Sequence, residues 1–413
     1  MDADTIAALA RQPRPFYGMP FQDWLAHRLG WLMVSFLNLF YFRARYHNRE
    51  IIPRDGPMLL LSNHGNFWDP FNIGIGCWRP LKFMAATSAM RLPFFGKLIK
   101  AFGAFPKKKF VKDRESMAQV EEYLARGYAV VIFPEGDRTW DGQPGAVPNG
   151  IGRLVKRSGV PVYIAVNPAA YLAHPRWARR PRLVPLDITY VGPLTWPDSA
   201  PPEQIAADIV RAISVRPHRD RSRAAFGWQL ARGLPDLLWA CPSCGAVGAL
   251  EVPAADADSI ACRRCAAAWR LDIDGQLHGQ GATPSMDIPE ARARIDAHFG
   301  SPPILDRARH AADGIVAPDE PARLRHHPRE GAPQPVAEGQ LWVTPTRVAL
   351  RGPGGAELWG RDFTALDAVT IEIKDQTFLR TDGELYSLAV PPGAALRWGH
   401  VLQTWFRSHK PLQ

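Results

Sequence analysis

The chain has 413 residues, more than one compact domain usually holds, so we expect two or three domains. Hydrophobic residues make up 46% of it and charged residues 22%, a composition that excludes a wholly disordered protein. The net charge of +10 is uneven, because residues 1–250 carry 32 basic and 19 acidic side chains. This basic part needs an anionic partner, and nucleic acid, an anionic membrane surface and a phosphate-bearing substrate are the candidates.

The N-terminal region, residues 1–45, contains an apolar stretch from Trp31 to Phe42 that is bracketed by arginines. It is too short to span a bilayer comfortably, and its length suits a helix that lies in the membrane interface. The flanking side chains Arg28, Arg43 and Arg45 would then contact anionic lipid. A buried core helix is the alternative interpretation. No secretory signal is recognisable at the start of the chain, so we expect the protein to stay in the cytosol.

Strand-like and helical segments alternate between residue 46 and about residue 240. Apolar runs that predict buried strands lie at residues 57–61, 128–133 and 160–166. The segment Glu115–Arg126 has apolar residues at helical spacing, with Gly127 as its stop. This alternation predicts an α/β domain whose central sheet is covered on both faces.

A histidine and a carboxylate follow the first of these strands, in Ser-Asn-His-Gly-Asn-Phe-Trp-Asp-Pro at residues 62–70. Open α/β sheets bind their ligands just past the carboxyl ends of strands, which is where His64 lies. On one continuous helix Asp69 would be about 140° around from His64 and out of reach of the ring. The bend at Gly65 and Asn66 allows the carboxylate to return to the imidazole, fix its tautomer and raise its basicity toward a hydroxyl.

A second turn follows the strand at residues 128–133 and reads Phe-Pro-Glu-Gly-Asp-Arg through Arg138. Pro-Glu-Gly predicts a tight turn at a strand end, and Arg138 can reach the same pocket as a phosphate clamp. Between the two blocks, the segment from Gly103 to Arg114 holds five positive charges. For Lys108 and Lys109 taken singly, a solvated surface is the alternative interpretation.

Together these blocks resemble the glycerophospholipid acyltransferase family, whose members acylate glycerol phosphate and 1-acylglycerol phosphate. The resemblance covers about residues 20–235 and includes a Val-Pro-Val strand at residues 160–162. The blocks also have the order and separation of the family. The resemblance implies an α/β acyltransferase domain, residues 46–240, with a central mixed sheet flanked by helices.

The resemblance implies that His64, oriented by Asp69, is the general base, and that the activated hydroxyl attacks the thioester of acyl-CoA or acyl carrier protein. It implies a lysophospholipid acceptor such as 1-acylglycerol 3-phosphate, a thioester donor, and no catalytic metal. Cys77 is then a buried structural thiol. The implied substrate-binding residues are Asn63, Lys107, Arg114, Glu135, Gly136 and Arg138.

Two features depart from the family pattern. The run from Lys107 to Lys112 resembles an insertion ahead of Arg114, and Asp137 stands where Thr or Ser is usual. An acyltransferase acting on a different lipid acceptor is therefore an alternative. A lipid-binding scaffold without turnover is another, which the complete set of His64, Asp69 and Phe-Pro-Glu-Gly disfavours. Nucleic-acid binding is disfavoured because no aromatic-rich basic stripe accompanies the arginines.

Four of the five cysteines form two tight pairs separated by seventeen residues: Cys241, Cys244, Cys262 and Cys265. This spacing predicts a zinc ribbon over residues 241–275, in which four thiolates close a tetrahedral site that stabilises the fold. A redox pair is the alternative. The metal would be structural, because a closed site leaves no position for a substrate.

The C-terminal part is predicted to contain a linker with a short helix, residues 276–312, and a β domain, residues 313–413. Strand-like runs lie at residues 339–344, 347–351, 357–363, 368–374, 377–381 and 384–390. A helix from Ala394 to His409 follows and would cover the open end of a small barrel. This layout resembles pleckstrin-homology-like and GRAM barrels. Its acidic balance favours a protein partner over a phosphoinositide. The combined expectation is an enzyme at the cytoplasmic face of the membrane, peripheral or monotopic.

Overall fold

The chain folds into two compact units in a computed structural model. Unit 1 comprises Met1–Arg176 and Pro181–Gly227, and unit 2 comprises Trp177–Arg180 and Trp228–Gln413. Residues 228–240, which the sequence prediction places in the first domain, group with unit 2. The structure describes residues 21–86, 90, 95–107, 114–145, 147, 149–299, 320–328, 331–344, 346–373, 376–391 and 394–409.

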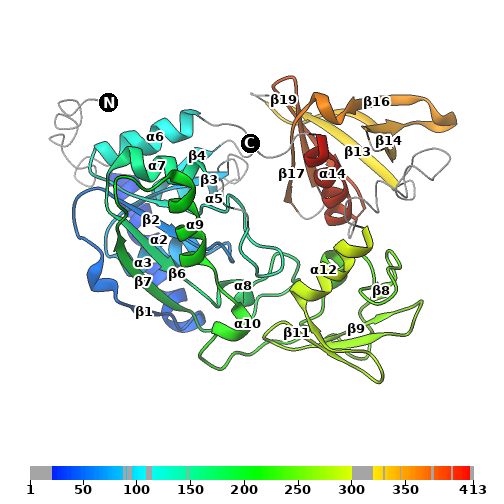
Figure 1. The fold of residues 1–413 in the computed structure, drawn as a ribbon, viewed down its shortest axis with the longest axis horizontal. Coiled ribbons are helices and arrows are strands. Elements are labelled where there is room, and N and C mark those ends of the chain that lie inside the picture. Colours follow the sequence, from blue (N-terminus) through cyan, green and yellow to red (C-terminus); the bar gives the residue numbers. More distant parts are fainter. Residues whose placement is uncertain are drawn as a thin grey trace. The chain divides into compact units, whose positions relative to one another are not determined.

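Unit 1 is built on one mixed seven-stranded sheet with the order β1-β7-β6-β2-β5-β3-β4 (Figure 1). All neighbouring strands run parallel except β6 and β7, which are antiparallel. The sheet confirms the predicted mixed α/β architecture. Its strands are β1 (Arg45–His47), β2 (Met58–Ser62), β3 (Leu81–Ala86), β4 (Ala104–Lys107), β5 (Ala129–Ile132), β6 (Val162–Val166) and β7 (Asp187–Leu194).

Helices cover both faces of this sheet. Leu59 and Leu61 of β2 share one hydrophobic cluster with residues of α6, α7 and α9, and Met58 and Leu60 alternate with them toward the other face. On that other side Tyr190 of β7 donates a hydrogen bond to a carbonyl of α3. The described helices are α2 (Phe21–Phe36), the π-helix η2 (Leu37–Tyr41), the 3-10 helix η3 (Arg49–Ile51), α3 (Asp69–Cys77), α5 (Phe95–Ala101), α6 (Arg114–Ala125), α7 (Gly150–Ser158), α8 (Ala170–Ala173), α9 (Pro202–Ile213) and α10 (Pro217–Asp220).

The three predicted apolar strands are confirmed as β2, β5 and β6, and the predicted helix at Glu115–Arg126 is confirmed as α6. Strand β2 is buried at all five positions, so it shows no alternation of polar and apolar residues. The sheet also contains β3 and β4, which the sequence pattern did not single out. Strand β4 includes Pro106, a residue that argues against a strand unless the strand lies at an edge, as β4 does.

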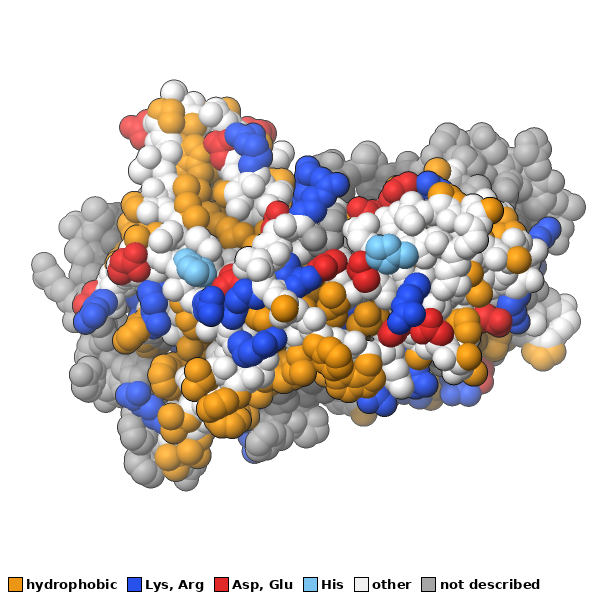
Figure 2. Space-filling model, turned by 90° about the horizontal axis from the view of Figure 1, so that it is seen from below, with side chains coloured by type: hydrophobic (Ala, Val, Ile, Leu, Met, Phe, Trp, Pro, Cys, Tyr) orange, Lys and Arg blue, Asp and Glu red, His pale blue; other side chains and the backbone are white. Residues whose placement is uncertain are grey.

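Helix α2 and η2 form the apolar N-terminal stretch, and their outer side is exposed. Leu32, Phe36, Leu39 and Phe40 are between 59% and 65% exposed, so a helix wholly buried in a core is not what the structure shows. Within the described residues, no helix combines the length and apolarity needed to cross a membrane. Hydrophobic side chains reach the surface in groups beside Lys and Arg side chains on the face that Figure 2 shows.

The first sheet of unit 2 has five short antiparallel strands in the order β12-β11-β10-β9-β8. This sheet continues past residue 275, the predicted end of the ribbon, because β10 pairs with β11 and β11 pairs with β12, whose last residue is Asp287. The predicted helix in the linker is confirmed as α12. The elements are α11 (Leu234–Leu237), β8 (Leu250–Glu251), β9 (Ser259–Cys262), β10 (Ala268–Leu271), β11 (Gln276–Gly279), β12 (Met286–Asp287) and α12 (Ile288–Phe299).

The second sheet of unit 2 has seven antiparallel strands in the order β16-β15-β14-β13-β19-β18-β17. Helix α14 packs against it, and Trp398, Leu402 and Trp405 are fully buried in the shared core, as the predicted closing helix requires. The six predicted strands are present, and β13 is an additional one. The elements are β13 (Glu320–His327), β14 (Gln334–Val343), β15 (Arg347–Arg351), η4 (Pro353–Gly355), β16 (Glu357–Asp362), η5 (Phe363–Ala365), β17 (Leu366–Ile373), β18 (Gln376–Thr381), β19 (Glu384–Ala389) and α14 (Ala395–His409).

Candidate active site

His64 lies in the loop that follows β2, at the carboxyl end of the central strand of unit 1. Its ring stacks on Phe133, which follows the neighbouring strand β5, with 4.1 Å between ring centroids. The adjacent Gly65 is required by packing, because a Cβ there would meet the backbone nitrogen of Tyr171 at 2.5 Å. The loop therefore holds the imidazole between two strand ends, and the side chain keeps 18% of its surface exposed.

Asp69 begins helix α3 and returns its carboxylate to His64. The distance from Nδ1 of His64 to Oδ2 of Asp69 is 3.0 Å, which confirms the predicted contact across the Gly65-Asn66 bend. The same Oδ2 accepts the backbone N–H of Asn66 at 2.7 Å, and Asp69 is fully buried. A buried carboxylate held by two donors keeps Nδ1 protonated and leaves Nε2 of His64 as the basic nitrogen.

The surrounding asparagines fix the loop to the segment that follows β6. Asn63 donates from Nδ2 to the carbonyl of Asn167 at 2.9 Å and accepts the backbone N–H of Asn167 on its own Oδ1 at 2.9 Å. Asn66 donates to the carbonyl of Ala170 at 3.1 Å. Asn63 was predicted to bind substrate. In the structure its amide joins the carboxyl ends of β2 and β6, so its described contacts are those of a scaffold.

Glu135 ties the histidine loop to a second loop. One carboxylate oxygen accepts the backbone N–H of His64 at 2.9 Å, and the other accepts that of Gly145 at 2.8 Å. Burial raises the pKa of Glu135 to about 7, against the lowering effect of these two hydrogen bonds. Gly136 has φ of +76°, a conformation that the tight turn requires and that favours glycine. These two residues position the turn that carries Arg138.

Arg138 is half-buried, with its guanidinium 6.0 Å from the ring centroid of Phe67. Burial, with a smaller contribution from the positive charge of Arg176, lowers the pKa of Arg138 to about 10. Arg176 was not singled out from the sequence. It donates to Oδ2 of Asp137 at 2.8 Å and lies 3.9 Å from the ring centroid of Trp140. Two guanidinium groups and one carboxylate therefore meet beside the histidine loop.

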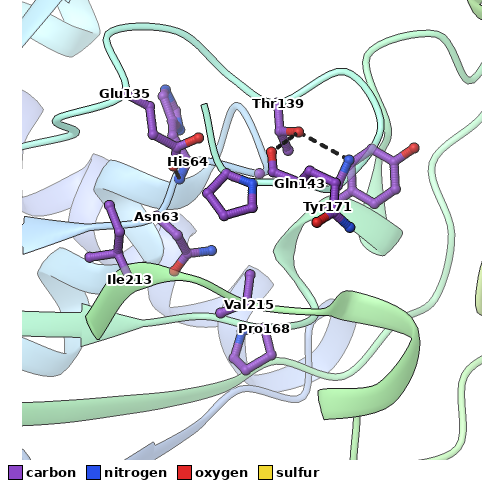
Figure 3. Close-up of a pocket in the computed structure, with 12 residues that line it drawn as sticks. Asn63, His64, Glu135, Thr139, Gln143, Pro168, Tyr171, Ile213 and Val215 are labelled. Carbon is purple, nitrogen blue, oxygen red and sulfur yellow. Dashed lines mark hydrogen bonds between the residues drawn. The ribbon is translucent and has the colours of Figure 1, made fainter. Parts of the chain in front are cut away.

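A narrow pocket adjoins His64 on the side of the residues 139–145 loop (Figure 3). Thr139 closes this loop, since its hydroxyl donates to the carbonyl of Gln143 at 2.6 Å and accepts the N–H of Gly142 at 3.0 Å. Pro168, Val215 and Ile213 line the opposite side. The cavity is about 10 Å³, which holds about one water molecule. A substrate larger than a water molecule must therefore approach the imidazole from another side.

A larger cavity of about 240 Å³ lies between α2, α3 and the sheet. Its lining is mostly apolar and aromatic, including Trp31, Phe71, Phe83 and Phe102, with Arg28 at α2 as one of its two basic residues. Helix α3, which supplies Phe71, is the helix that begins at Asp69. An apolar cavity thus borders the element that carries the carboxylate of the site.

Lys107 and Arg114 can be placed only by their backbone. Lys107 ends β4 and Arg114 begins α6, and the side chains of both lie outside the described residues, as do Lys108, Lys109 and Lys112. Their predicted role in binding a phosphate stays a prediction. Cys77 is buried at the end of α3, and burial raises the pKa of its thiol to about 12, which excludes a reactive thiolate at neutral pH.

The four paired cysteines converge in unit 2, and their sulfur atoms all lie within 4.8 Å of one another. The Sγ atoms of Cys241 and Cys265 are 3.8 Å apart, and those of Cys244 and Cys262 are 3.9 Å apart. Zinc bound by thiolates at about 2.3 Å in a tetrahedron places its sulfurs about 3.8 Å apart. The cluster therefore fits a four-thiolate zinc site, as its spacing predicts.

The arrangement around His64 suits proton transfer from a hydroxyl. Burial lowers the pKa of His64 below its ordinary value, Arg138 adds to that effect, and the hydrogen bond to Asp69 opposes it. A lowered pKa keeps the imidazole neutral at physiological pH, as a general base requires. The nearby guanidinium of Arg138 supplies positive charge for an anionic group on the same substrate.

Comparisons with known proteins point to unit 1. Residues 43–167 match the Acyltransferase family. The chain is 31% identical over 168 residues to a 1-acyl-sn-glycerol-3-phosphate acyltransferase of Pseudomonas aeruginosa, a match that covers 39% of this chain and 63% of that protein. It is 25% identical over 146 residues to a chloroplast 1-acyl-sn-glycerol-3-phosphate acyltransferase of Arabidopsis thaliana, covering 35% and 41% of the two chains.

Among solved structures, the chain is similar to the 1-acyl-sn-glycerophosphate acyltransferase of Thermotoga maritima, with a TM-score of 0.39 and 16% identity. That alignment covers 51% of this chain and 84% of the other. The chain spans less than two thirds of the length of the curated relatives described above. The family match at residues 43–167 includes His64, Asp69 and Arg138.

Proposed function

We propose that this chain is an enzyme of the glycerophospholipid acyltransferase family and that it acylates a lysophospholipid at a membrane surface, which the match of residues 43–167 to the Acyltransferase family supports. The donor in this proposal is a thioester of coenzyme A or acyl carrier protein, and the acceptor is a lysophospholipid such as 1-acylglycerol 3-phosphate. The observation that carries the proposal is the His64–Asp69 pair at the carboxyl end of β2, with Arg138 in the adjacent turn.

In the proposed reaction, Nε2 of His64 takes the proton of the acceptor hydroxyl while the hydroxyl oxygen attacks the thioester carbonyl. The new C–O bond forms as the carbonyl becomes an oxyanion. Its collapse breaks the C–S bond, and the leaving thiolate takes the proton back from His64. Asp69 keeps the ring in the required tautomer throughout, and Arg138 holds the phosphate of the acceptor.

The apolar cavity of about 240 Å³ beside α3 supports an acyl substrate. Fatty acyl chains are sequestered from water by apolar and aromatic walls, which this cavity provides. Because residues of α2 line it, a chain bound there would lie next to the exposed apolar face of that helix. This placement supports a lipid substrate over a polar one.

The direct test is acyl transfer by the purified chain. Acyl-CoA and 1-acylglycerol 3-phosphate are mixed with the protein, and free coenzyme A and the diacyl product are measured. We expect both products in equal amounts and neither without the acceptor. Binding of the lysophospholipid with no release of coenzyme A or of acyl carrier protein from its thioester would instead support the alternative, a lipid-binding scaffold without turnover.

The pH profile of kcat/KM should show an acidic limb below pH 6.5, because burial lowers the pKa of His64 from that ordinary value. The charged groups around the ring are Asp69, Asp137, Glu135 and Arg138. Asp69→Asn removes a group that raises the pKa of His64, so the acidic limb should move to lower pH. Arg138→Gln removes a group that lowers the pKa of His64, so the acidic limb should move to higher pH.

Glu135 provides the control for this pH profile, since its pKa of about 7 lies in the same range. Glu135→Gln should leave the position of the limb unchanged while lowering thermal stability, because the amide can accept only one of the two backbone N–H groups. If the acidic limb disappears in Glu135→Gln and keeps its position in Arg138→Gln, the ionisation belongs to Glu135, which would contradict the role of His64.

The exposed side of α2 and η2 should bind anionic membranes. Phe36 and Phe40 are each 62% exposed with their rings 4.5 Å apart, and the basic side chain of Arg28 is exposed on the same helix. The double substitution Phe36→Ser and Phe40→Ser should weaken binding to anionic vesicles about 10²- to 10⁴-fold, because each of the two phenyl rings contributes about 1.5–3 kcal/mol when buried. Vesicle co-sedimentation measures this.

Leu358→Ser is the matched control for the membrane test. Leu358 is 49% exposed in β16 of unit 2, so the substitution removes a similar exposed apolar side chain elsewhere. Equal loss of vesicle binding in both variants, or no loss in the phenylalanine variant, would show that α2 is not the membrane contact.

We propose that Cys241, Cys244, Cys262 and Cys265 bind a structural zinc ion. The fit of the sulfur distances to a zinc tetrahedron supports this, as does the matched geometry of the two cysteine turns. In each turn the backbone N–H of the fourth residue after the first cysteine, Gly245 or Ala266, donates to that cysteine's carbonyl. Both residues have positive φ, so the two turns have the same form.

A further inference from the structure

Arg176 is a buried guanidinium that belongs to none of the motifs discussed above. Its side chain is 3% exposed, and its guanidinium lies over the ring of Trp140, 3.9 Å from the ring centroid. From Nη1 it donates to Oδ2 of Asp137 at 2.8 Å and to the carbonyl of Arg138 at 3.2 Å. The side chain therefore contacts both the acidic residue of the turn and the backbone of the proposed phosphate clamp.

Asp137 places a negative charge next to the clamp. Its Oδ1 accepts the backbone N–H of Arg138 at 2.8 Å, and its Oδ2 receives Arg176. Each oxygen of Asp137 therefore already accepts a hydrogen bond, one of them from a guanidinium. Without Arg176, the carboxylate would lose its guanidinium partner beside Arg138, where it would compete for the Arg138 side chain and repel a phosphate bound there.

We propose that Arg176 is a positioning residue for the acceptor: by pairing with Asp137 it prevents this carboxylate from opposing a phosphate held by Arg138. The inference rests on the proposed function and adds a requirement to it. An acidic residue next to Arg138, such as Asp137, needs a buried positive charge that pairs with it. It also makes a specific claim, which is that Arg176 is needed only while Asp137 is present.

A double-mutant cycle tests that claim with wild type, Arg176→Met, Asp137→Thr and the double variant. Arg176→Met should raise KM for 1-acylglycerol 3-phosphate about 10- to 100-fold, as expected when one partner of a buried charge pair is removed. KM for acyl-CoA should change less than about two-fold, since Arg176 acts on the acceptor side. The double variant should return KM for the acceptor to within about three-fold of wild type.

Arg176→Lys is the conservative control. A lysine keeps the positive charge near Asp137 but loses the guanidinium that lies over Trp140, so KM for the acceptor should rise less than with Arg176→Met. If Arg176→Met does not fold, the proposal is tested by comparing Asp137→Thr with the double variant. Under the proposal, removing Arg176 in the threonine background changes KM for the acceptor by less than about three-fold.

Two results would overturn the proposal. A double variant as impaired as Arg176→Met would show that Arg176 itself contacts the acceptor. Equal changes in KM for acceptor and acyl-CoA would show a general structural role.

Failure of the proposed function is separated from failure of this inference by a binding measurement. The same four proteins are titrated with inorganic phosphate by calorimetry. Weaker phosphate binding by Arg176→Met that the second substitution restores would support the pairing even if wild type transfers no acyl group. Phosphate binding that is the same in all four proteins would contradict it.

Discussion

His64→Ala should lower kcat for acyl transfer about 10²- to 10⁴-fold, the usual contribution of a positioned general base. The fold should persist, because His64 lies in a loop past β2 and its side chain loses only the stacking on Phe133 and one hydrogen bond to Asp69. Release of coenzyme A with 1-acylglycerol 3-phosphate measures the rate, and the melting temperature measures the fold.

His47→Ala is the matched control for this result. His47 lies in β1 of the same unit and also faces a carboxylate, with Nε2 3.3 Å from Oδ1 of Asp187, but its side chain is 50% exposed. It should leave kcat within about two-fold of wild type. Undiminished turnover by folded His64→Ala would contradict the mechanism, as would an equal loss in His47→Ala.

The contact between His64 and Asp69 was predictable because two local signals agree. A strand end places the histidine at the edge where ligands bind, and the glycine after it lets the chain bend back before α3 begins. The sequence does not reveal how tightly the site is enclosed. The narrow pocket beside His64 depends on Pro168 and Val215, which come from distant segments without a recognisable motif.

Arg176 shows where such prediction ends. Nothing in its local sequence distinguishes it from nearby arginines. Only the fold brings it into contact with Asp137, which lies 39 residues earlier in the chain. Strand β13, and the strands that continue the five-stranded sheet past residue 275, were missed for a different, local reason. Strand β13 mixes charged and apolar residues because one side of it is exposed, and β11 and β12 are too short to show a period.

Replacing Cys241 and Cys244 with serine should remove zinc and unfold the five-stranded sheet at residues 250–287. The sheet is small, with strands of two to four residues, so its core is small. Its buried apolar side chains include Leu250, Ile260, Trp269, Leu271, Leu277 and Met286. Structural zinc contributes about 10–16 kcal/mol in zinc-finger peptides, which exceeds what this sheet can supply by packing. Elemental analysis should find about one zinc in wild type and none in the variant.

Amide hydrogen exchange locates the unfolding, which should appear in residues 250–287 and spare the sheet of unit 1. Cys77→Ala is the matched control, because it removes a buried cysteine of unit 1 and should leave the zinc content unchanged. Wild-type protein that contains no metal yet protects residues 250–287 from exchange would contradict the zinc assignment.

Acyl transfer separates a structural zinc from one that serves the active site. The segment Trp177–Arg180 belongs to unit 2, where Arg179 donates its backbone N–H to Arg232 at 3.2 Å and its guanidinium to Asp236 at 2.6 Å. Because Arg176 directly precedes this segment, disorder in unit 2 should disturb its pairing with Asp137. We therefore expect the serine variant to keep most of its kcat, since His64 and Asp69 rest on the sheet of unit 1, while KM for the lysophospholipid rises. Complete loss of kcat in a variant whose unit 1 remains folded would mean that the metal supports the reaction itself.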